Sequence, residues 1–360
     1  MKMLKVGFIG LGYRGMLAVE RNLHIPEVEI AAVCDIDSSR IEQALATITA
    51  SGKKPAATYS DWKELCAAPE LDLVYICTEW TLHTEIAVFA MKMGHHAAVE
   101  VPAAVTIGQC IQLVQTSRET GKHLMMLENC VYDLFEMTTA AMAEDGLFGE
   151  IYHAEGGYLH NIKDKNPWRK DFNKRHRGDF YPTHGLGPIC RVMGIGKKDR
   201  LTTLQSVDSK FGDGCYHTTT IIRTELGHTI ILQHNIDAAM PYSRKYQILG
   251  TQGYACKYPE EHLFFAGDSE SFIPDGQQAE LMGKYIPTEW RDNKTYLDTL
   301  EPKRRMDYVM DLRLARCLIA GVAPDMTAYD AALWSCVGAL SEESISKGSI
   351  PVEIPDFSKF

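Results

Sequence analysis

The chain has 360 residues, 45% of them hydrophobic, which is enough for two domains that each bury a core. Its 47 acidic residues outnumber its 37 basic ones, and the formal net charge of -10 excludes nucleic-acid phosphates and anionic membranes as general partners of the surface. The favoured partner is therefore a small molecule.

Short apolar runs alternate with helical patterns over the first 127 residues. Alternation of this kind predicts βαβ units and a parallel sheet. The expected strands are Val6–Gly10, Val28–Asp35, Leu73–Cys77, Ala97–Val101 and His123–Leu127.

The pattern changes after a further helix expected at Tyr132–Asp145. Runs with period-two alternation at Tyr216–Thr224 and His228–Ile236 flank a tight turn at Gly227, which predicts an antiparallel sheet. Helices are expected at Arg305–Ala320 and Tyr329–Glu343, followed by an extended tail, Pro351–Phe357. We expect one face of this sheet to lack a helical cover, and a homo-oligomer to form through it.

The first strand leads directly into a glycine-rich loop, Gly10-Leu11-Gly12-Tyr13-Arg14-Gly15, and Asp35 ends the second strand. This is the dinucleotide fingerprint in its required context. Gly10 permits the tight turn, Gly12 admits the pyrophosphate, and Gly15 lets the helix pack on the sheet. Asp35 would bind the adenosine ribose and repel a 2′-phosphate, so NAD is expected as the cofactor.

These patterns predict an α/β protein of two domains. Residues 1–130 are expected to form an NAD-binding Rossmann domain with a parallel sheet. Residues 131–360 are expected to form a substrate-binding α+β domain with an open, mainly antiparallel sheet, the C-terminal helices and the tail.

Cysteine usage and the start of the chain bear on compartment and metals. Ten cysteines form no CxxC pair and no cluster with zinc-ligand spacing, so we expect reduced, mostly buried thiols and no metal. The chain opens on a strand pattern without a leader, and no apolar run approaches the ~20 residues of a membrane span. A soluble, cytoplasmic protein is expected, although a leader removed on export would leave no trace.

The segments Glu79–His83, Glu100–Pro102 and Glu128–Asn129 follow the fourth, fifth and sixth strands, and they resemble motifs of the Gfo/Idh/MocA oxidoreductases. That family contacts nicotinamide and ribose through residues at the ends of the fourth, fifth and sixth strands. The matching positions here are Trp80, His83, Glu100, Val101 and Asn129. Most dehydrogenases of the family carry Glu-Lys-Pro at the fifth strand, whereas this chain has Glu100-Val101-Pro102.

Four further stretches narrow the resemblance to glycoside hydrolase family 109, whose members include α-N-acetylgalactosaminidases. The resemblance covers essentially the whole chain. The stretches are Glu100–Val105, Met125–Cys130, Tyr181–Pro188 and Pro351–Phe357.

The resemblance implies a closed redox cycle on a retained NAD. The expected substrates are N-acetylgalactosaminides. The sugar C3 hydroxyl is oxidised to a ketone, which acidifies the C2 proton and allows the group at C1 to be eliminated. Water then adds, and C3 is reduced again. The paired carboxylates of an ordinary glycosidase are then unnecessary.

His184 is the first candidate for proton transfer at C3, because imidazole titrates near neutrality and the family places a histidine from this region beside the nicotinamide. Tyr181 lies three residues earlier and is a candidate for substrate contact or acid–base work. Tyr132, Tyr158 and Tyr242 match substrate-side positions, and each is a candidate for the base at C2.

Arg169 is a candidate for binding sugar hydroxyls or the acetamido carbonyl, with Arg177 as its competitor. Both lie in the segment Asn161–Phe180, which has little periodicity and is expected to be a long functional loop.

Two other functions are compatible with this fold, since fold alone does not fix function. One is a net NAD-dependent sugar or polyol dehydrogenase, against which Val101 in the lysine position counts. The other is a sugar-binding and NAD-binding sensor without catalysis, against which the retained Tyr181 and His184 count.

Overall fold

The computed structural model describes residues 3–68, 70–161, 167–211, 215–237, 239–267 and 270–360. Its contacts divide the chain into two compact units. Unit 1 comprises residues 1–127, 297–333 and 357–360, and unit 2 comprises residues 128–296 and 334–356. Unit 1 therefore also contains residues far beyond the expected boundary at residue 130. Within the described ranges, no helix combines the length and the apolar character needed to cross a bilayer.

Unit 1 is built on a six-stranded parallel sheet with the strand order β3-β2-β1-β4-β5-β6. The order reverses beside β1, and in such sheets ligands bind at the carboxyl ends of the strands next to this reversal. Strand β3 was not predicted, because it is short and its side chains are mostly exposed. The strands are β1 Leu4–Ile9, β2 Val28–Cys34, β3 Ala57–Tyr59, β4 Leu73–Ile76, β5 His96–Val99 and β6 Leu124–Met126.

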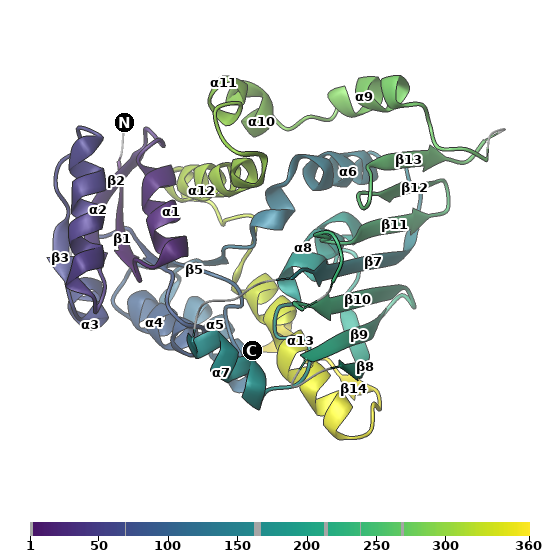
Figure 1. Ribbon diagram of the computed structural model, residues 1–360, viewed down its shortest axis with the longest axis horizontal. Helices are drawn as coiled ribbons and strands as arrows, with labels where there is room; N and C mark the ends of the chain where they lie inside the picture. Colours follow the sequence, from purple (N-terminus) through teal and green to yellow (C-terminus); the bar gives the residue numbers. More distant parts are fainter. Residues whose placement is uncertain (1–2, 69, 162–166, 212–214, 238, 268–269) are drawn as a thin grey trace. The chain divides into compact units, whose positions relative to one another are not determined.

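The helices of unit 1 include one from the C-terminal part of the chain, α12, which packs beside α1 (Figure 1). Arg21 of α1, which is 6% exposed, donates to Asp311 of α12 over 2.9 Å. The hydroxyl of Tyr75 donates to the same carboxylate. The helices are α1 Tyr13–Asn22, α2 Ser38–Ala50, α3 Trp62–Cys66, α4 Trp80–Lys92, α5 Ile107–Thr120 and α12 Pro302–Ala320, with a short 3-10 helix, η2, at Phe357–Lys359.

Unit 2 is built on an eight-stranded sheet with the order β13-β12-β11-β7-β10-β9-β8-β14. Strands β7 and β10 pair in parallel and the other pairs are antiparallel, so the expected open, mainly antiparallel sheet is confirmed. The strands are β7 Ile151–Leu159, β8 Leu201–Phe211, β9 Cys215–Thr224, β10 Thr229–Asn235, β11 Tyr246–Gly250, β12 Gly253–Cys256, β13 His262–Phe265 and β14 Val352–Glu353.

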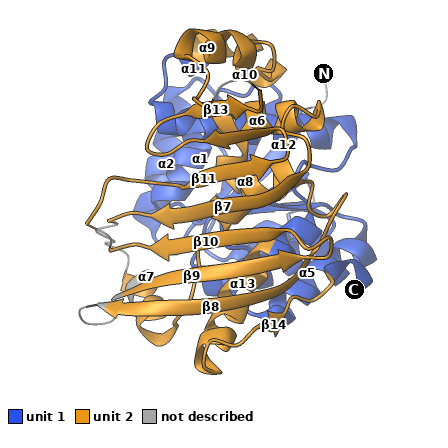
Figure 2. Cartoon of the chain, turned by 90° about the vertical axis from the view of Figure 1, so that its right-hand side faces the viewer, with its two compact units in different colours: residues 1–127, 297–333, 357–360 blue, residues 128–296, 334–356 orange. Residues whose placement is uncertain are grey.

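Helices cover one face of this sheet. Figure 2 shows the other face turned to the viewer, with no described helix of the unit in front of its strands. The helical segments are η1 Asn129–Tyr132, α6 Leu134–Glu144, α7 Pro167–Arg175, α8 Thr183–Met193, α9 Asp275–Gly283, α10 Thr288–Asp292, α11 Lys294–Leu297 and α13 Ala328–Ser346; the unit boundaries cut α11 and α13.

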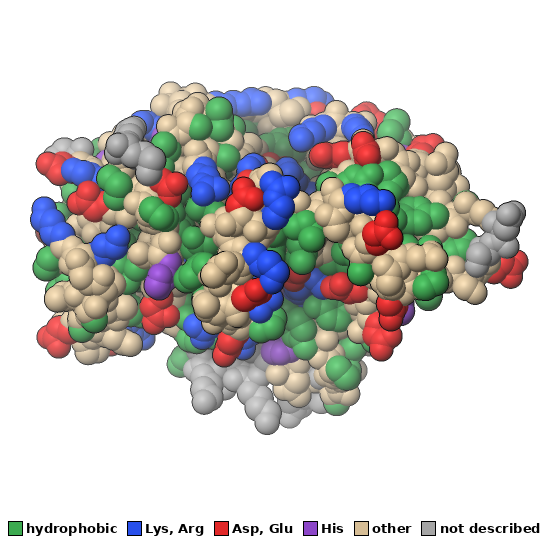
Figure 3. Space-filling view, turned by 90° about the horizontal axis from the view of Figure 1, so that it is seen from above, with side chains coloured by type: hydrophobic (Ala, Val, Ile, Leu, Met, Phe, Trp, Pro, Cys, Tyr) green, Lys and Arg blue, Asp and Glu red, His purple; other side chains and the backbone are tan. Residues whose placement is uncertain are grey.

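Charged side chains of both signs are intermingled on the face drawn in Figure 3. Nine cysteines are described and all nine are free thiols, eight of them buried. The expected burial of most cysteines is therefore confirmed for the described residues.

Candidate active site

The glycine-rich loop of unit 1 has the close contacts that a dinucleotide loop requires. Gly10 has φ +85°, and a Cβ on it would lie 2.6 Å from the Cys77 carbonyl oxygen. A Cβ on Gly15 would lie 1.8 Å from the Gly10 carbonyl oxygen. Only glycine fits at either position, so α1 begins tightly against the loop.

The start of α1 is suited to an anion. Among the described residues, no side chain caps the helix at Gly12 and no acidic residue lies in its first turn. The N–H groups at the positive end of the helix dipole are therefore available to a pyrophosphate. These residues fit the expected NAD cofactor.

Asp35 lies at the end of β2 and is 6% exposed. Its carboxylate accepts from the backbone N–H of Leu11 over 2.6 Å and from that of Asp37 over 2.9 Å. Arg40 lies 3.5 Å away. Asp35 thus fastens the glycine-rich loop to β2, and the remaining lone pairs of its carboxylate are those that a ribose could use.

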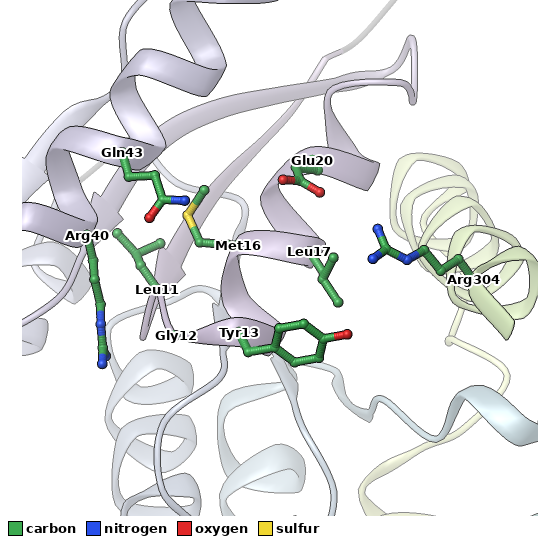
Figure 4. Close-up of a pocket in the computed structure, with 9 residues that line it drawn as sticks. All are labelled: Leu11, Gly12, Tyr13, Met16, Leu17, Glu20, Arg40, Gln43 and Arg304. Carbon is green, nitrogen blue, oxygen red and sulfur yellow. The ribbon is translucent and has the colours of Figure 1, made fainter. Parts of the chain in front are cut away.

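A groove of about 420 Å³ opens beside this loop (Figure 4). Tyr13, which is 71% exposed, extends its ring along the groove, and Arg304 of α12 points toward α1 from the opposite side. The lining residues are Leu11, Gly12, Tyr13, Met16, Leu17, Glu20, Arg40, Gln43 and Arg304.

The residues matched to nicotinamide contacts are mostly buried. Arg14 Nε donates to Glu100 over 2.8 Å, which places a cation of the loop at the end of β5. Trp80 is 5% exposed and Val101 is 4% exposed. Asn129, from unit 2, is 6% exposed.

His83 differs from the expectation of a cofactor contact through its side chain. Its ring is 1% exposed, with Nδ1 2.8 Å from the Pro102 carbonyl oxygen and Nε2 3.0 Å from that of Thr78. Burial lowers its pKa. A neutral imidazole has one N–H, so it donates to one of these two carbonyl oxygens, and both ring nitrogens face backbone atoms.

His184 lies in the first turn of α8, where its Nδ1 is 2.8 and 2.9 Å from the two carboxylate oxygens of Glu128. Glu128 is 0% exposed, whereas the His184 side chain is 12% exposed. Burial acts to raise the pKa of Glu128, but the charge and hydrogen bond of His184 lower it below its ordinary value. The pair is thus a buried carboxylate bonded to a partly accessible imidazole.

A cluster of aromatic rings surrounds His184. The His184 ring lies 5.1 Å from the Tyr158 ring and 4.7 Å from the Tyr181 ring, both edge to face. Tyr242, which is 43% exposed, lies 6.0 Å from Tyr158 and 4.9 Å from His160. The structure therefore brings together four of the predicted residues, Tyr158, Tyr181, His184 and Tyr242.

The glycines of the segment Thr183–Pro188 explain this placement. A Cβ on Gly185 would lie 2.4 Å from the backbone nitrogen of Gly157, so α8 rests directly on β7. A Cβ on Gly187 would lie 3.0 Å from both Glu128 Cγ and the Trp334 ring. Within unit 2 these glycines therefore lie close to β7 and Glu128.

Tyr132 and Tyr158 are two of the candidates for the base at C2. Tyr132 in η1 is 2% exposed, which leaves its side chain little access to a substrate. Burial raises the pKa of Tyr158 to about 12, although the charge of Arg169 acts in the opposite direction. The Tyr158 hydroxyl is therefore protonated at neutral pH in this unit.

The competing arginines have different surroundings. The Arg169 guanidinium lies 4.8 Å from the centre of the Tyr181 ring, in the aromatic cluster. Arg177 forms a paired hydrogen bond with Asp208, with Nη2 to Oδ1 at 2.7 Å. Both arginines come from a segment expected to be a loop, which instead contains helix α7; residues 162–166 of that segment lie outside the described residues.

Two polar groups beside this cluster were not predicted from the sequence. Asp179 is 2% exposed and accepts from the Tyr181 backbone N–H over 3.1 Å. His234 Nδ1 lies 3.8 Å from the Asp179 carboxylate. Burial raises the pKa of Asp179 to about 7 and lowers that of His234 to about 3. No motif marks either residue, because their juxtaposition depends on sheet pairing.

Glu128, Cys130 and His184 place three potential metal-ligand atoms within 4.8 Å of one another. Burial raises the pKa of the Cys130 thiol well above its ordinary value, which disfavours the thiolate that a metal requires. His184 Nδ1 and the Glu128 carboxylate are already bonded to each other. The hydrogen-bonded pair accounts for this cluster, and we assign no metal to it.

Two family models match different parts of the chain. Residues 4–128 match the family model described as oxidoreductase family, NAD-binding Rossmann fold. Residues 132–216 and 209–360 match the model described as glycosyl hydrolase 109, C-terminal domain.

Relatives match over nearly the whole chain. Glycosyl hydrolase family 109 protein 1 of Bacteroides thetaiotaomicron is 42% identical, over 99% of this chain and 85% of the relative. A Bacteroides fragilis protein named alpha-N-acetylgalactosaminidase is 39% identical, over 99% of this chain and 92% of the relative.

Among solved structures, levoglucosan dehydrogenase in complex with NADH and levoglucosan has a TM-score of 0.80 and 19% identity. The alignment covers 98% of this chain and 100% of the dehydrogenase, and it shows a shared fold. The family matches go further: this chain belongs to glycosyl hydrolase family 109 and is an NAD-dependent glycoside hydrolase.

Proposed function

We propose that this protein is an α-N-acetylgalactosaminidase that keeps NAD bound through its catalytic cycle. The observation that carries the proposal is the His184–Glu128 pair within a cluster of tyrosines, in a chain that also has a dinucleotide loop. The 39% identity to the Bacteroides fragilis alpha-N-acetylgalactosaminidase supports the choice of sugar.

Unit 1 would hold the cofactor. The N–H groups at Gly12 and the side chains of Tyr13 and Arg14 would bind the pyrophosphate, and Asp35 the adenosine ribose. Trp80, Glu100 and Val101 would line the nicotinamide end, as in the family. Bound NAD supplies a hydride acceptor at sugar C3 that later returns the same hydride, so the reaction has no net oxidation.

Unit 2 would move the protons. His184 Nε2 would take the proton of the C3 hydroxyl, since Nδ1 is bonded to Glu128. Tyr181 would take the C2 proton, because its ring lies beside both His184 and the Arg169 guanidinium. Tyr158, which stays protonated, would donate to the oxygen that leaves C1. Arg169 and Tyr242 would bind the sugar.

A screen of α- and β-linked aryl N-acetylgalactosaminides and related glycosides tests this function. We expect release of the aryl group from the α-linked N-acetylgalactosaminide with no accumulation of NADH. His184→Ala should lower kcat by about 10²–10⁴ while NAD remains bound. Net formation of NADH from a free sugar would instead identify a sugar dehydrogenase.

The uncovered face of the eight-stranded sheet would join two copies of the chain. Val207, Ile221 and Leu249 are 48%, 46% and 36% exposed on strands of this sheet. Apolar side chains exposed together on a sheet favour association. Ile221→Lys should reduce the mass measured by light scattering if this face forms the interface; an unchanged oligomer would place the interface elsewhere.

A further inference from the structure

Glu128 and His184 come from two elements that are distant in the sequence. Glu128 immediately precedes η1, and His184 follows 56 residues later in the first turn of α8. Both carboxylate oxygens lie within 2.9 Å of His184 Nδ1. The Cys130 backbone N–H also donates to Glu128 Oε1 over 3.0 Å, which fixes the orientation of the carboxylate.

The bond determines which ring nitrogen carries a proton. An ionised carboxylate can only accept hydrogen bonds, so Nδ1 must donate. A neutral imidazole has one N–H, and Nε2 is then a bare acceptor. Within the described part of the chain, Nε2 makes no hydrogen bond, and the ring keeps 12% of its surface exposed.

The backbone is shaped to admit this carboxylate. Gly187, one turn after His184, faces Glu128, and a Cβ there would lie 3.0 Å from Glu128 Cγ. A larger residue at position 187 would force the glutamate away from α8. The contact is therefore a built feature of unit 2, because glycine at this position leaves the room that the glutamate fills.

We propose that Glu128 is a positioning residue that holds His184 in the tautomer with Nε2 unprotonated and stabilises the imidazolium that forms. The inference rests on the proposed function. In the proton-transfer step the O–H bond of the sugar hydroxyl breaks, its electron pair stays on oxygen, and a new N–H bond forms at Nε2. Glu128 keeps its negative charge throughout, as does the orienting carboxylate of a Ser-His-Asp triad.

The first test uses the wild-type protein without substrate, so that its outcome is independent of turnover. In protein labelled with ¹⁵N-histidine, NMR spectra that correlate ring protons with ring nitrogens distinguish the two tautomers. The His184 signals are those lost in His184→Ala. We expect a protonated Nδ1 and a bare Nε2; a protonated Nε2 with a bare Nδ1 would overturn the proposal.

The second test uses Glu128→Gln, which keeps the shape of the side chain but removes its charge. We expect a mixture of His184 tautomers and a kcat lower by about 10²–10⁴, with KM changed little because Glu128 is fully buried and bonded to His184. Glu128→Asp, which restores the charge, should recover part of kcat. Wild-type spectra and wild-type kcat in Glu128→Gln would contradict the positioning role.

Glu155→Gln is the matched control. Glu155 lies 3.7 Å from His153 Nε2 in the same unit, so the variant also removes a carboxylate beside a histidine. We expect its kcat and its His184 signals to equal those of the wild type. Stoichiometric zinc in the purified protein, with His184 signals that change on adding EDTA, would replace the hydrogen-bonded pair by a metal site. If no glycoside is hydrolysed, the proposed function fails and the spectra still decide the tautomer.

Discussion

Asp35 illustrates how a candidate ligand of the ribose can also hold the backbone of its own site in place. Asp35 directly follows strand β2, at the expected ribose site. Its carboxylate accepts from the backbone N–H groups of Leu11 and Asp37. The spacing of the glycines and the acid was sufficient to select this residue from the sequence. The fastening of the loop by the same carboxylate was not visible there, because both contacts are to backbone atoms.

Replacing Asp35 by Ala should weaken NAD binding by about 1–3 kcal/mol, the scale of lost charge-assisted hydrogen bonds. The affinity can be measured by calorimetry on protein freed of cofactor. Asp37→Ala is the control, since Asp37 caps α2 through Ser39 and is not assigned to the cofactor. Equal NAD affinity in Asp35→Ala and Asp37→Ala would show that Asp35 does not bind the ribose.

Asp179 should make the stability of unit 2 depend on pH. Burial raises its pKa from an ordinary value of 3.8 to about 7. Between these values the folded protein keeps a proton that the unfolded chain has lost, so the free energy of unfolding falls as pH rises from about 4 to 7. The loss is complete above pH 7 and is of the order of 4 kcal/mol.

Asp179→Asn should remove this contribution. The amide keeps an oxygen for the Tyr181 N–H and has no charge to desolvate. We expect the variant to be more stable than the wild type at pH 8 and similar at pH 4, as measured by urea unfolding at both values. Asp171→Asn, at an exposed carboxylate of α7, should leave the wild-type pH dependence unchanged. A parallel pair of curves for Asp179→Asn and the wild type would contradict the prediction.

At the scale of elements, helix α8 positions His184 because the helix lies directly on β7. Gly156, Gly157 and Gly185 leave no side chain between the helix and the strand. This contact brings His184 against Tyr158, whose ring lies 5.1 Å away. A helix held away by an ordinary side chain would leave the imidazole too far from both the ring and Glu128.

Gly185→Ala should destabilise the protein by about 1–3 kcal/mol, because its Cβ would lie 2.4 Å from the Gly157 nitrogen. Activity should fall with it, since the helix that carries His184 must shift. Gly108→Ala in α5 is the matched control: a Cβ there has no described atom within 4 Å, and alanine favours a helix by about 1 kcal/mol. Unfolding in urea measures both, and equal midpoints would refute the close contact.

Helix α12 shows where reasoning from sequence stops. Its limits were predicted nearly correctly, and its N-terminus extends to Pro302. Its place in unit 1 follows from buried ion pairs between Arg21 and the pair Asp307 and Asp311. These residues are about 290 positions apart, and a local pattern of hydrophobic residues does not report such a pairing.

For the whole molecule, periodicity and one motif predicted both sheets and the cofactor loop. The prediction was good where each signal is local, as in the hairpin of β9 and β10 with its turn at Gly227. The prediction was poor where function depends on side chains that are distant in the sequence. His184 was found through its family motif, but its partner Glu128 was recognised only as part of a motif matched to cofactor contacts.

The reaction proposed for the whole molecule is tested most directly at C2 of the sugar. Elimination through a C3 ketone must remove the C2 proton, whereas direct displacement at C1 leaves it in place. In heavy water the released sugar should therefore carry deuterium at C2, which NMR or mass spectrometry detects. A C2-deuterated substrate should also turn over more slowly if this step limits kcat.

Return of the abstracted proton without exchange would mimic displacement in that experiment. A single-turnover comparison of C2-protonated and C2-deuterated substrate separates the two cases, because a primary isotope effect requires cleavage of the C2–H bond. Where the abstracted proton does exchange, substrate tritiated at C2 releases its label to water. His184→Ala provides the control for the order of steps. Since oxidation at C3 must precede loss of the C2 proton, the variant should release tritium as slowly as it releases the aglycone. Normal tritium release with slow hydrolysis would place His184 after the elimination rather than at C3.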